Sequence, residues 1–154
     1  MSEYTATIIW RRGDGDFAGN TYSRAHEWHF DGGLAVPASS SPGIVPLPMS
    51  EPANVDPEEA FVAALSSCHM LFFLSLAAER GIVVDRYADD ASGILQKNED
   101  GQVAMTRVVL RPKADYGAGA APERSEIEAL HHRAHELCFI ANSVLTEVVT
   151  EIVS

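Results

Sequence analysis

The spacing of apolar and polar residues predicts β-strands in several parts of the chain. Residues 4–10 are rich in Thr, Ile and aromatic side chains, a composition typical of strands. Further segments with strand character are 21–30, 34–36, 82–87, 91–97, 102–110 and 144–153. Residues 11–20 and 112–122 are rich in Gly, Asp, Ala or Pro and are predicted to be loops. The turn at 98–101 ends in Asp-Gly, which favours a hairpin.

Two helices are predicted by their end signals. The first begins at Asp56, a good N-cap, and Pro57 follows at the first helical position. Glu58 and Glu59 lie favourably at the positive end of the helix dipole, and the helix runs to about Arg80, where Gly81 ends it. A second helix is predicted from 122 to about 138, again with acidic residues in its first turn.

The first helix has no charged residue between 60 and 78, a length close to that of a membrane span. Its acidic N-terminal cap, its serines and the lack of an aromatic belt argue against that interpretation. A helix that is apolar on nearly every side is expected to be buried on every side. One chain of 154 residues covers such a helix with difficulty, so we expect a second copy of the chain to complete its burial.

The segment from 37 to 57 holds six of the eight prolines. Proline removes backbone donors and restricts φ, so neither a helix nor a central strand is expected there. A connection of this length without regular structure is often functional, and otherwise it serves as a linker along the surface.

Composition and charge restrict the class of function. The apolar content of 46% is typical of a globular protein, and the length suits a single domain, residues 1–154. The formal net charge of -11 disfavours binding to nucleic acid or to anionic membranes. No signal peptide is recognisable, so we expect a cytoplasmic location, where the two cysteines do not form a permanent disulfide.

Cys68 and Cys138 are each predicted to lie on a helix, seventy residues apart. Each could be an inert thiol in the core, because free cysteine is among the most buried residue types. Two cysteines on separate elements can also form a peroxide-reducing pair. One is then oxidised to sulfenic acid, and the second condenses with it to a disulfide. The residues alone leave both interpretations open.

Three histidines cluster on the second helix. His131 and His135 lie on one face, Cys138 follows one turn later, and His132 lies between them in the sequence. Imidazole and thiolate together suit zinc, although neither a fourth ligand nor the glutamate of a His-Glu-x-x-His motif is present. We therefore expect no metal site, and the cluster is more simply a partly exposed helix face. His69 follows Cys68 but points about 100° away from it on a helix.

A reactive thiolate needs a cation nearby, because an ordinary cysteine is mostly protonated at neutral pH. Arginine suits this role since it remains charged when partly buried. The N-terminal segment offers Arg24, with Arg11 as the second choice. Glu58 or Glu59 could orient the guanidinium.

Two motifs resemble those of the OsmC/Ohr family, the osmotically induced proteins and organic hydroperoxide resistance proteins. Residues 56–68 resemble its Asn-Pro-Glu-Glu/Gln-Leu-…-Cys signature, and residues 135–143 resemble its second-cysteine motif. The order of predicted elements also fits along nearly the whole chain. The resemblance implies an α+β, OsmC-like fold with antiparallel sheets packed around long central helices, assembled as an intertwined homodimer.

The resemblance also implies an activity and the residues that perform it. Family members are peroxiredoxin-like enzymes that reduce organic hydroperoxides in the oxidative stress response. The implied site has Cys68 as the peroxidatic and Cys138 as the resolving cysteine, with Glu58 as the motif glutamate and Arg24 as the arginine. No cofactor is implied, and a dithiol such as a lipoyl group, or a low-molecular-weight thiol, would regenerate the enzyme. The alternative is a non-catalytic small-molecule-binding module on the same fold.

One geometric expectation follows from the predicted helix. Glu58 and Cys68 lie ten residues apart on it, which is about 15 Å along the axis. A glutamate of one chain would therefore serve the cysteine of the other chain, with the two helices crossing near a twofold axis.

Overall fold

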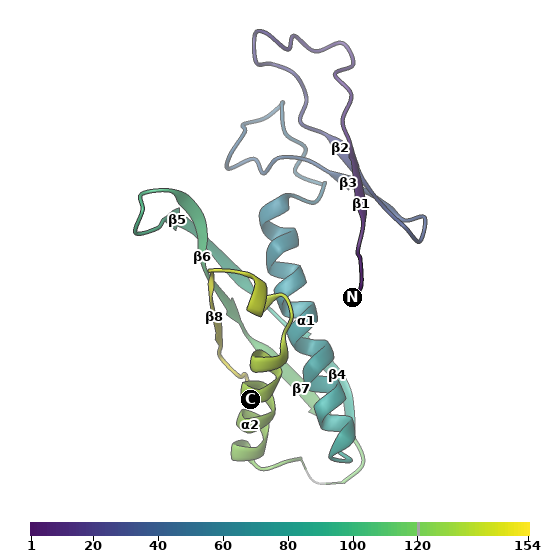
Figure 1. The fold of residues 1–154 in the computed structure, drawn as a ribbon, viewed down its shortest axis with the longest axis vertical. Coiled ribbons are helices and arrows are strands. Elements are labelled where there is room, and N and C mark those ends of the chain that lie inside the picture. The colour runs from purple at the N-terminus through teal and green to yellow at the C-terminus, as the bar shows by residue number, and fades with distance from the viewer. Residues whose placement is uncertain (120) are drawn as a thin grey trace. The chain divides into compact units, whose positions relative to one another are not determined.

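The computed structural model describes residues 1–119 and 121–154, and Ala120, in the predicted loop, lies outside them. The chain divides into two compact units, residues 1–60 and 61–154. The first unit contains a three-stranded antiparallel sheet of β1 (Ala6–Ile9), β2 (His26–Phe30) and β3 (Ala35–Ala38), in that order (Figure 1). Strands β1 and β2 lie inside the predicted segments 4–10 and 21–30. Strand β3 runs two residues past the predicted 34–36, because Pro37 is tolerated on an edge strand.

The proline-rich connection in the first unit is held in place by backbone and side-chain hydrogen bonds. The fully buried Ser39 donates its backbone N–H to the carbonyl of Val55, and its hydroxyl accepts the N–H of Glu51. Val55 in turn donates to the carbonyl of Pro37, and the Asn54 amide donates to Ala38. The connection therefore has a defined path without regular secondary structure.

Helix α1 (Pro57–Glu79) begins and ends where the sequence predicts. The Asp56 carboxylate accepts the N–H of Glu59 at 2.8 Å, and the Glu59 carboxylate accepts the N–H of Asp56, also at 2.8 Å, which is a reciprocal capping box. At the other end Gly81 has a φ of 70°, and Ile82 donates its N–H to the carbonyl of Ala77. These are the bonds of a glycine-terminated helix end.

The second unit contains two sheets. One pairs β4 (Val84–Asp89) with β7 (Pro112–Tyr116), and the other has the order β5 (Ser92–Lys97), β6 (Val103–Leu110), β8 (Glu147–Thr150). The hairpin between β5 and β6 turns at Gly101, whose φ is 76°, and the Asn98 side chain accepts two backbone N–H groups of the turn. This turn confirms the hairpin predicted at 98–101.

Two expectations about the strands are wrong. The loop predicted at 112–122 begins with strand β7, because Pro112 lies at the start of the strand, where its missing N–H is tolerated. The sheets are also not all antiparallel, since β8 runs parallel to β6. A parallel pair needs a long crossover connection, and helix α2 (Arg124–Leu137) lies in that connection.

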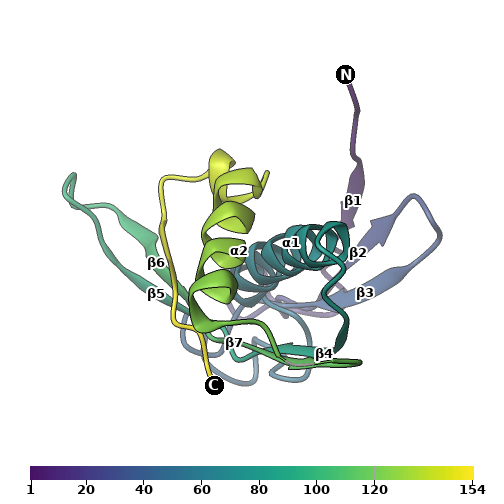
Figure 2. The ribbon, with the colours of Figure 1, turned by 90° about the horizontal axis from the view of Figure 1, so that it is seen from below.

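The core of the second unit lies between the two helices and the sheets. Helix α2 crosses α1 rather than running along it: Figure 2 shows α1 nearly end-on and α2 across the view, with the β4–β7 sheet on one side of both (Figures 1 and 2). Phe73 of α1 packs with Leu130 and Ala134 of α2, while Leu65 packs with Val108 and Leu110 of β6. The core therefore consists of two clusters along one face of α1, and the buried His69 lies between Leu65 and Phe73 on that face.

The remaining surface of α1 is not buried within one chain. Its buried positions form a single stripe of Leu65, His69, Phe73 and Ala77, whereas Leu71 is 60% exposed. The burial on every side that was predicted for this helix is therefore not present in a single copy. By length and composition alone α1 could also cross a bilayer, a property that core helices of soluble proteins share.

Candidate functional site

The two cysteines lie together in the second unit. Cys68 is in the middle of α1 and half-buried, and Cys138 follows the last residue of α2 and is 1% exposed. The Cys68 thiol lies near enough to Cys138 to raise its pKa. Burial raises the pKa of Cys138 to about 11, opposed by the N–H of Ala141 and aided by the nearby Cys68. Cys138 is therefore a protonated thiol at neutral pH.

The end of α2 determines where the Cys138 sulfur lies. The Cys138 backbone leaves the helical conformation, with φ -61° and ψ 110°, and its N–H still donates to the carbonyl of His135. The short 3₁₀ helix η1 (Ala141–Ser143) follows, and the N–H of Ala141 points to the Cys138 sulfur at 3.4 Å. The Asn142 side chain donates to the Glu136 carbonyl and so closes the helix end. The Ser/Asn segment of the second motif thus caps the helix and contacts the thiol.

Arg24 and Glu58 line one pocket of about 440 Å³ in the first unit. Arg24 is held by its own loop, because its guanidinium donates to the side chain of Asn20 at 2.6 Å and to the carbonyl of Tyr22. The guanidinium also lies over the Tyr22 ring, 3.6 Å from the ring centre. Arg11 is not among the residues that line this pocket. The pocket therefore brings Glu58 together with Arg24, the first choice among the arginines.

The Glu58 carboxylate is half-buried and incompletely paired. Its Oε2 atom is inaccessible to solvent and has no hydrogen-bond partner among the described residues. A buried carboxylate oxygen without a donor is costly, so it is a group ready to accept a hydrogen bond. Glu59 has a different role, since it belongs to the capping box of α1.

Aromatic side chains form one wall of the same pocket. Trp10, Phe17 and Tyr22 pack together with ring centres 4.7 to 5.8 Å apart. Sequence analysis missed this cluster, because residues 11–20 were interpreted only as a loop. The detectable signal was the presence of three aromatic residues around a Gly/Asp-rich segment.

The predicted site residues thus form two pairs. Cys68 lies near Cys138 in the second unit, and Arg24 and Glu58 line the same pocket in the first, with no ion pair between them among the described residues. Glu58 and Cys68 lie on one helix, ten residues apart, which separates them by about 15 Å along the axis. A single α1 therefore cannot carry Glu58 to the thiol of the same helix.

A buried histidine pair is the polar feature that sequence analysis missed. His69 of α1 and His131 of α2 are 1% and 3% exposed, and Nε2 of His69 lies 2.9 Å from Nδ1 of His131. Burial lowers the pKa of His69 to about 4 and that of His131 to about 3, so both rings are neutral at pH 7. The signal in the sequence was the position of His69 on the Leu65–Phe73 stripe.

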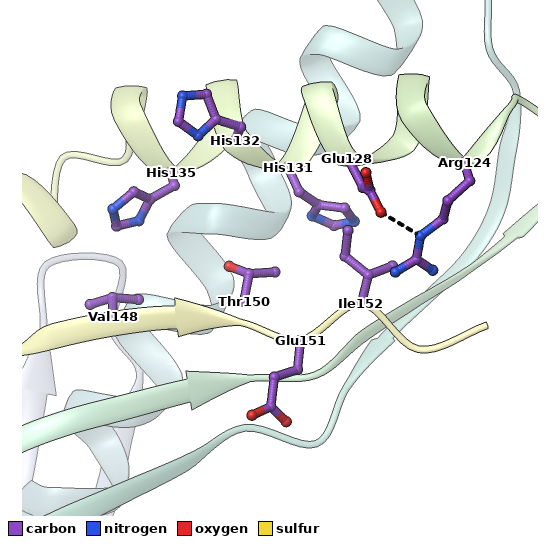
Figure 3. A pocket seen from close by; sticks show the side chains of 9 residues that line it. All are labelled: Arg124, Glu128, His131, His132, His135, Val148, Thr150, Glu151 and Ile152. Carbon is purple, nitrogen blue, oxygen red and sulfur yellow. Dashed lines mark hydrogen bonds and ion pairs between the residues drawn. The ribbon is translucent and has the colours of Figure 1, made fainter.

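The histidines of α2 also line a second pocket, of about 540 Å³, between α2 and β8. His131 and His135 point from the helix toward the strand, whereas His132 points away from it (Figure 3). Arg124 in this pocket is paired with Glu128 at 2.8 Å. Among the described residues no three His, Cys, Asp or Glu side chains are arranged to hold a metal ion.

Comparisons with known proteins agree on one family. Residues 50–153 match the family model described as OsmC-like protein. An OsmC-like protein of unknown function from Vibrio cholerae is 57% identical and has a TM-score of 0.97, with 99% of this chain and 100% of that chain covered. No curated protein sequence matches the chain.

More distant solved structures share the fold. An organic hydroperoxide resistance protein from Elizabethkingia anophelis, with thiocyanate bound, has a TM-score of 0.71 at 17% identity and covers 99% of this chain and 94% of its own. The organic hydroperoxide resistance protein OsmC from Legionella pneumophila has a TM-score of 0.68 at 18% identity, covering 99% and 97%. The mixed α+β architecture is thus the OsmC-like fold.

Proposed function

Because this chain belongs to the OsmC-like protein family, we propose that it is a thiol-dependent peroxidase that reduces organic hydroperoxides. The observation that carries the proposal is the proximity of the Cys68 and Cys138 thiols, which lie seventy residues apart in the sequence but near enough for Cys68 to raise the pKa of Cys138. Two free thiols close together are the arrangement that a peroxide-reducing dithiol cycle requires.

The environments of the two thiols suggest which one reacts first. Cys68 is half-buried, so a peroxide can reach it, whereas Cys138 is 1% exposed and held protonated by burial. Cys68 is therefore the peroxidatic residue and Cys138 the resolving residue. The thiolate of Cys68 attacks the outer peroxide oxygen, the O–O bond breaks, and the alkoxide takes a proton to leave as an alcohol.

The second step consumes the thiol proton of Cys138. The sulfenic acid formed on Cys68 condenses with the Cys138 thiol, which gives a disulfide and releases one water. A dithiol such as a lipoyl group, or a low-molecular-weight thiol, then reduces the disulfide by thiol–disulfide exchange. The cycle needs no bound cofactor or metal. We place the enzyme in the cytoplasm, where such reductants are present.

We assign Arg24 and Glu58 to the first step in a site shared between two copies of the chain. The Arg24 guanidinium stabilises the attacking thiolate, and Glu58 supplies the unpaired carboxylate oxygen that orients it. The separation of Glu58 and Cys68 along α1 requires that these groups come from different chains. Each site of a homodimer would then contain the cysteines of one copy and the Arg24–Glu58 pair of the other.

The exposed apolar surface near the cysteines supports this assembly. Leu71 is 60% exposed and Phe139 is 71% exposed, and Phe139 packs edge-on against Phe72 with ring centres 5.0 Å apart. Large apolar side chains at the surface are stabilised when a second copy covers them. The same apolar surface and the aromatic wall at Trp10, Phe17 and Tyr22 suit an organic group better than hydrogen peroxide alone.

The second candidate function is a non-catalytic small-molecule-binding module. The pocket of Arg24, Glu58 and the aromatic cluster favours it, since this pocket exists without the cysteines. Such a module would bind its ligand equally well when Cys68 is replaced by Ser.

Stopped-flow oxidation distinguishes the two functions. The reduced protein is mixed with cumene hydroperoxide or with hydrogen peroxide, and free thiols are titrated before and after. A peroxidase loses two thiols per chain, and it loses them faster with the organic peroxide. Retention of both thiols with cumene hydroperoxide would leave the binding module as the better account.

A further inference from the structure

The buried His69–His131 pair lies between the two helices that lead to the reactive thiols. His69 directly follows Cys68 on α1, and His131 lies two turns before Cys138 at the end of α2. The ring of His131 is stacked on Phe73, with ring centres 4.2 Å apart and planes 17° apart. The pair is therefore fixed by apolar packing as well as by its own hydrogen bond.

The unpaired Nδ1 atom of His69 indicates which ring donates in the His69–His131 hydrogen bond. Both imidazoles are neutral, so one ring donates and the other accepts. The Nδ1 atom of His69 is buried without a hydrogen-bond partner among the described residues. A buried N–H without an acceptor is rarer than a buried lone pair without a donor, so Nδ1 of His69 carries no proton. Nε2 of His69 therefore donates to Nδ1 of His131.

This bond is the only side-chain hydrogen bond that joins α1 to α2 within the described part of the chain. The other contacts between these helices are apolar, through Phe73, Leu130 and Ala134. Apolar contacts are non-directional and tolerate a shift along the axis, whereas a buried polar pair is satisfied in one register only. The pair therefore distinguishes the observed alignment of the helices from shifted ones.

We propose that His69 and His131 are positioning residues that set the register of α1 against α2, and thereby place the Cys138 thiol for disulfide formation with Cys68. A disulfide requires its two Cβ atoms to lie about 3.5–4.5 Å apart, so a shift of even part of a turn would separate the sulfurs. This proposal rests on the proposed function, in which the Cys68 sulfenic acid and the Cys138 thiol become a disulfide and one water. Peroxide attack on Cys68 does not depend on that alignment.

The test measures how readily the two thiols form a disulfide without any peroxide. Reduced protein is equilibrated in glutathione buffers of graded potential. The equilibrium between the Cys68–Cys138 disulfide and glutathione gives the effective concentration of one thiol toward the other. His69→Leu and His131→Leu should each lower it by at least about fivefold, the factor expected for one lost hydrogen bond. His69→Gln keeps a donor at the position of Nε2, and His131→Asn keeps an acceptor at the position of Nδ1, so both should remain close to wild type.

The double variant His69→Leu/His131→Leu distinguishes an effect on the alignment of the two helices from an effect on the stability of the fold. Replacing both partners leaves no orphaned polar group, so its unfolding free energy in urea should equal or exceed that of the single variants. Its effective concentration should nevertheless stay low. Phe73→Leu is the matched control, because it loosens the same interface and keeps the hydrogen bond. A wild-type value in the double variant, or an equal loss in Phe73→Leu, would overturn the proposal.

A peroxide experiment on the same variants keeps the two proposals apart. With cumene hydroperoxide, the leucine variants should oxidise Cys68 at the wild-type rate and accumulate its sulfenic acid. If wild-type protein forms the disulfide in glutathione but ignores the hydroperoxide, the proposed peroxidase activity is wrong and the register proposal stands. If the glutathione titration is unchanged in all variants, the register proposal is wrong whatever the peroxide does.

Discussion

Glu58 and Cys68 lie on the same helix, α1, about 15 Å apart along its axis, and Glu58 lines a pocket with Arg24 rather than with either cysteine. This relationship leads to the proposal of a site shared between two chains. It also provides a test that does not depend on the rate of any single variant.

Mixing two inactive variants should restore activity. Cys68→Ser lacks the thiol and Glu58→Ala lacks the carboxylate, so each homodimer should be inactive. After unfolding and refolding a mixture of equal parts, half of the dimers should be mixed, each with one complete site. Peroxidase activity should therefore return to about a quarter of the wild-type value. A monomeric protein, or mixed dimers without activity, would rule out the shared site.

Replacing Arg24 should slow the oxidation of Cys68. Loss of a preorganised cation at a site of developing charge typically lowers the rate about 100-fold. The rate of Cys68 oxidation in Arg24→Ala, measured by stopped flow, should therefore be about 100-fold lower than in the wild type. Arg11→Ala removes the same charge from an exposed position outside the pocket and is the matched control. Thermal unfolding of both variants checks that the slower oxidation is not caused by a loss of stability when Arg24 no longer contacts Tyr22. If Arg11→Ala oxidises slowly and Arg24→Ala remains fully active, Arg11 rather than Arg24 stabilises the Cys68 thiolate.

The buried histidines should make the protein less stable in mild acid. Burial, and after it His135, lowers the pKa of His69 to about 4 in the folded chain, with Asp89 opposing, from 6.5 in the unfolded chain. Between these values the unfolded state binds more protons, so the free energy of unfolding decreases as the pH falls from about 6.5. From pH 7 to 4 the loss due to His69 alone should be about 3 kcal/mol.

Urea unfolding at pH 7 and pH 4 measures this dependence. His69→Leu should be destabilised at pH 7 by the orphaned acceptor of His131, but should lose less stability on acidification than the wild type does. Phe73→Leu loosens the same core without removing a titrating group. The decrease in its free energy of unfolding from pH 7 to pH 4 should therefore match that of the wild type. An identical pH dependence in wild type and His69→Leu would show that His69 is not buried as a neutral ring.

Local signals in the sequence predicted the parts of the fold that depend on local chemistry. Asp56 and Gly81 marked the ends of α1 because an N-cap and a left-handed glycine act within one helical turn. The Asp100-Gly101 turn predicted its hairpin for the same reason. The parallel pairing of β8 with β6 depends on a crossover through α2, which no local pattern records.

The candidate site was predictable only in part. The motifs identified Cys68, Cys138 and Glu58. The structure places the two cysteines near each other and puts Glu58 in a pocket with Arg24, an arginine that neither motif contains. The His69–His131 bond joins residues sixty-two positions apart, and such a contact depends on helix packing rather than on spacing. Neighbouring helix positions point about 100° apart, which separates the His69 side chain from Cys68 but does not exclude a partner on another helix.

Mass spectrometry of the oxidised protein tests the central claim most directly. One equivalent of cumene hydroperoxide should give a disulfide between Cys68 and Cys138 within one chain, and Cys138→Ser should instead carry a trappable sulfenic acid on Cys68. Peptide mapping after alkylation locates both products. If Cys68 remains unmodified after this treatment in wild type and in Cys138→Ser, the protein is not a peroxidase that uses Cys68.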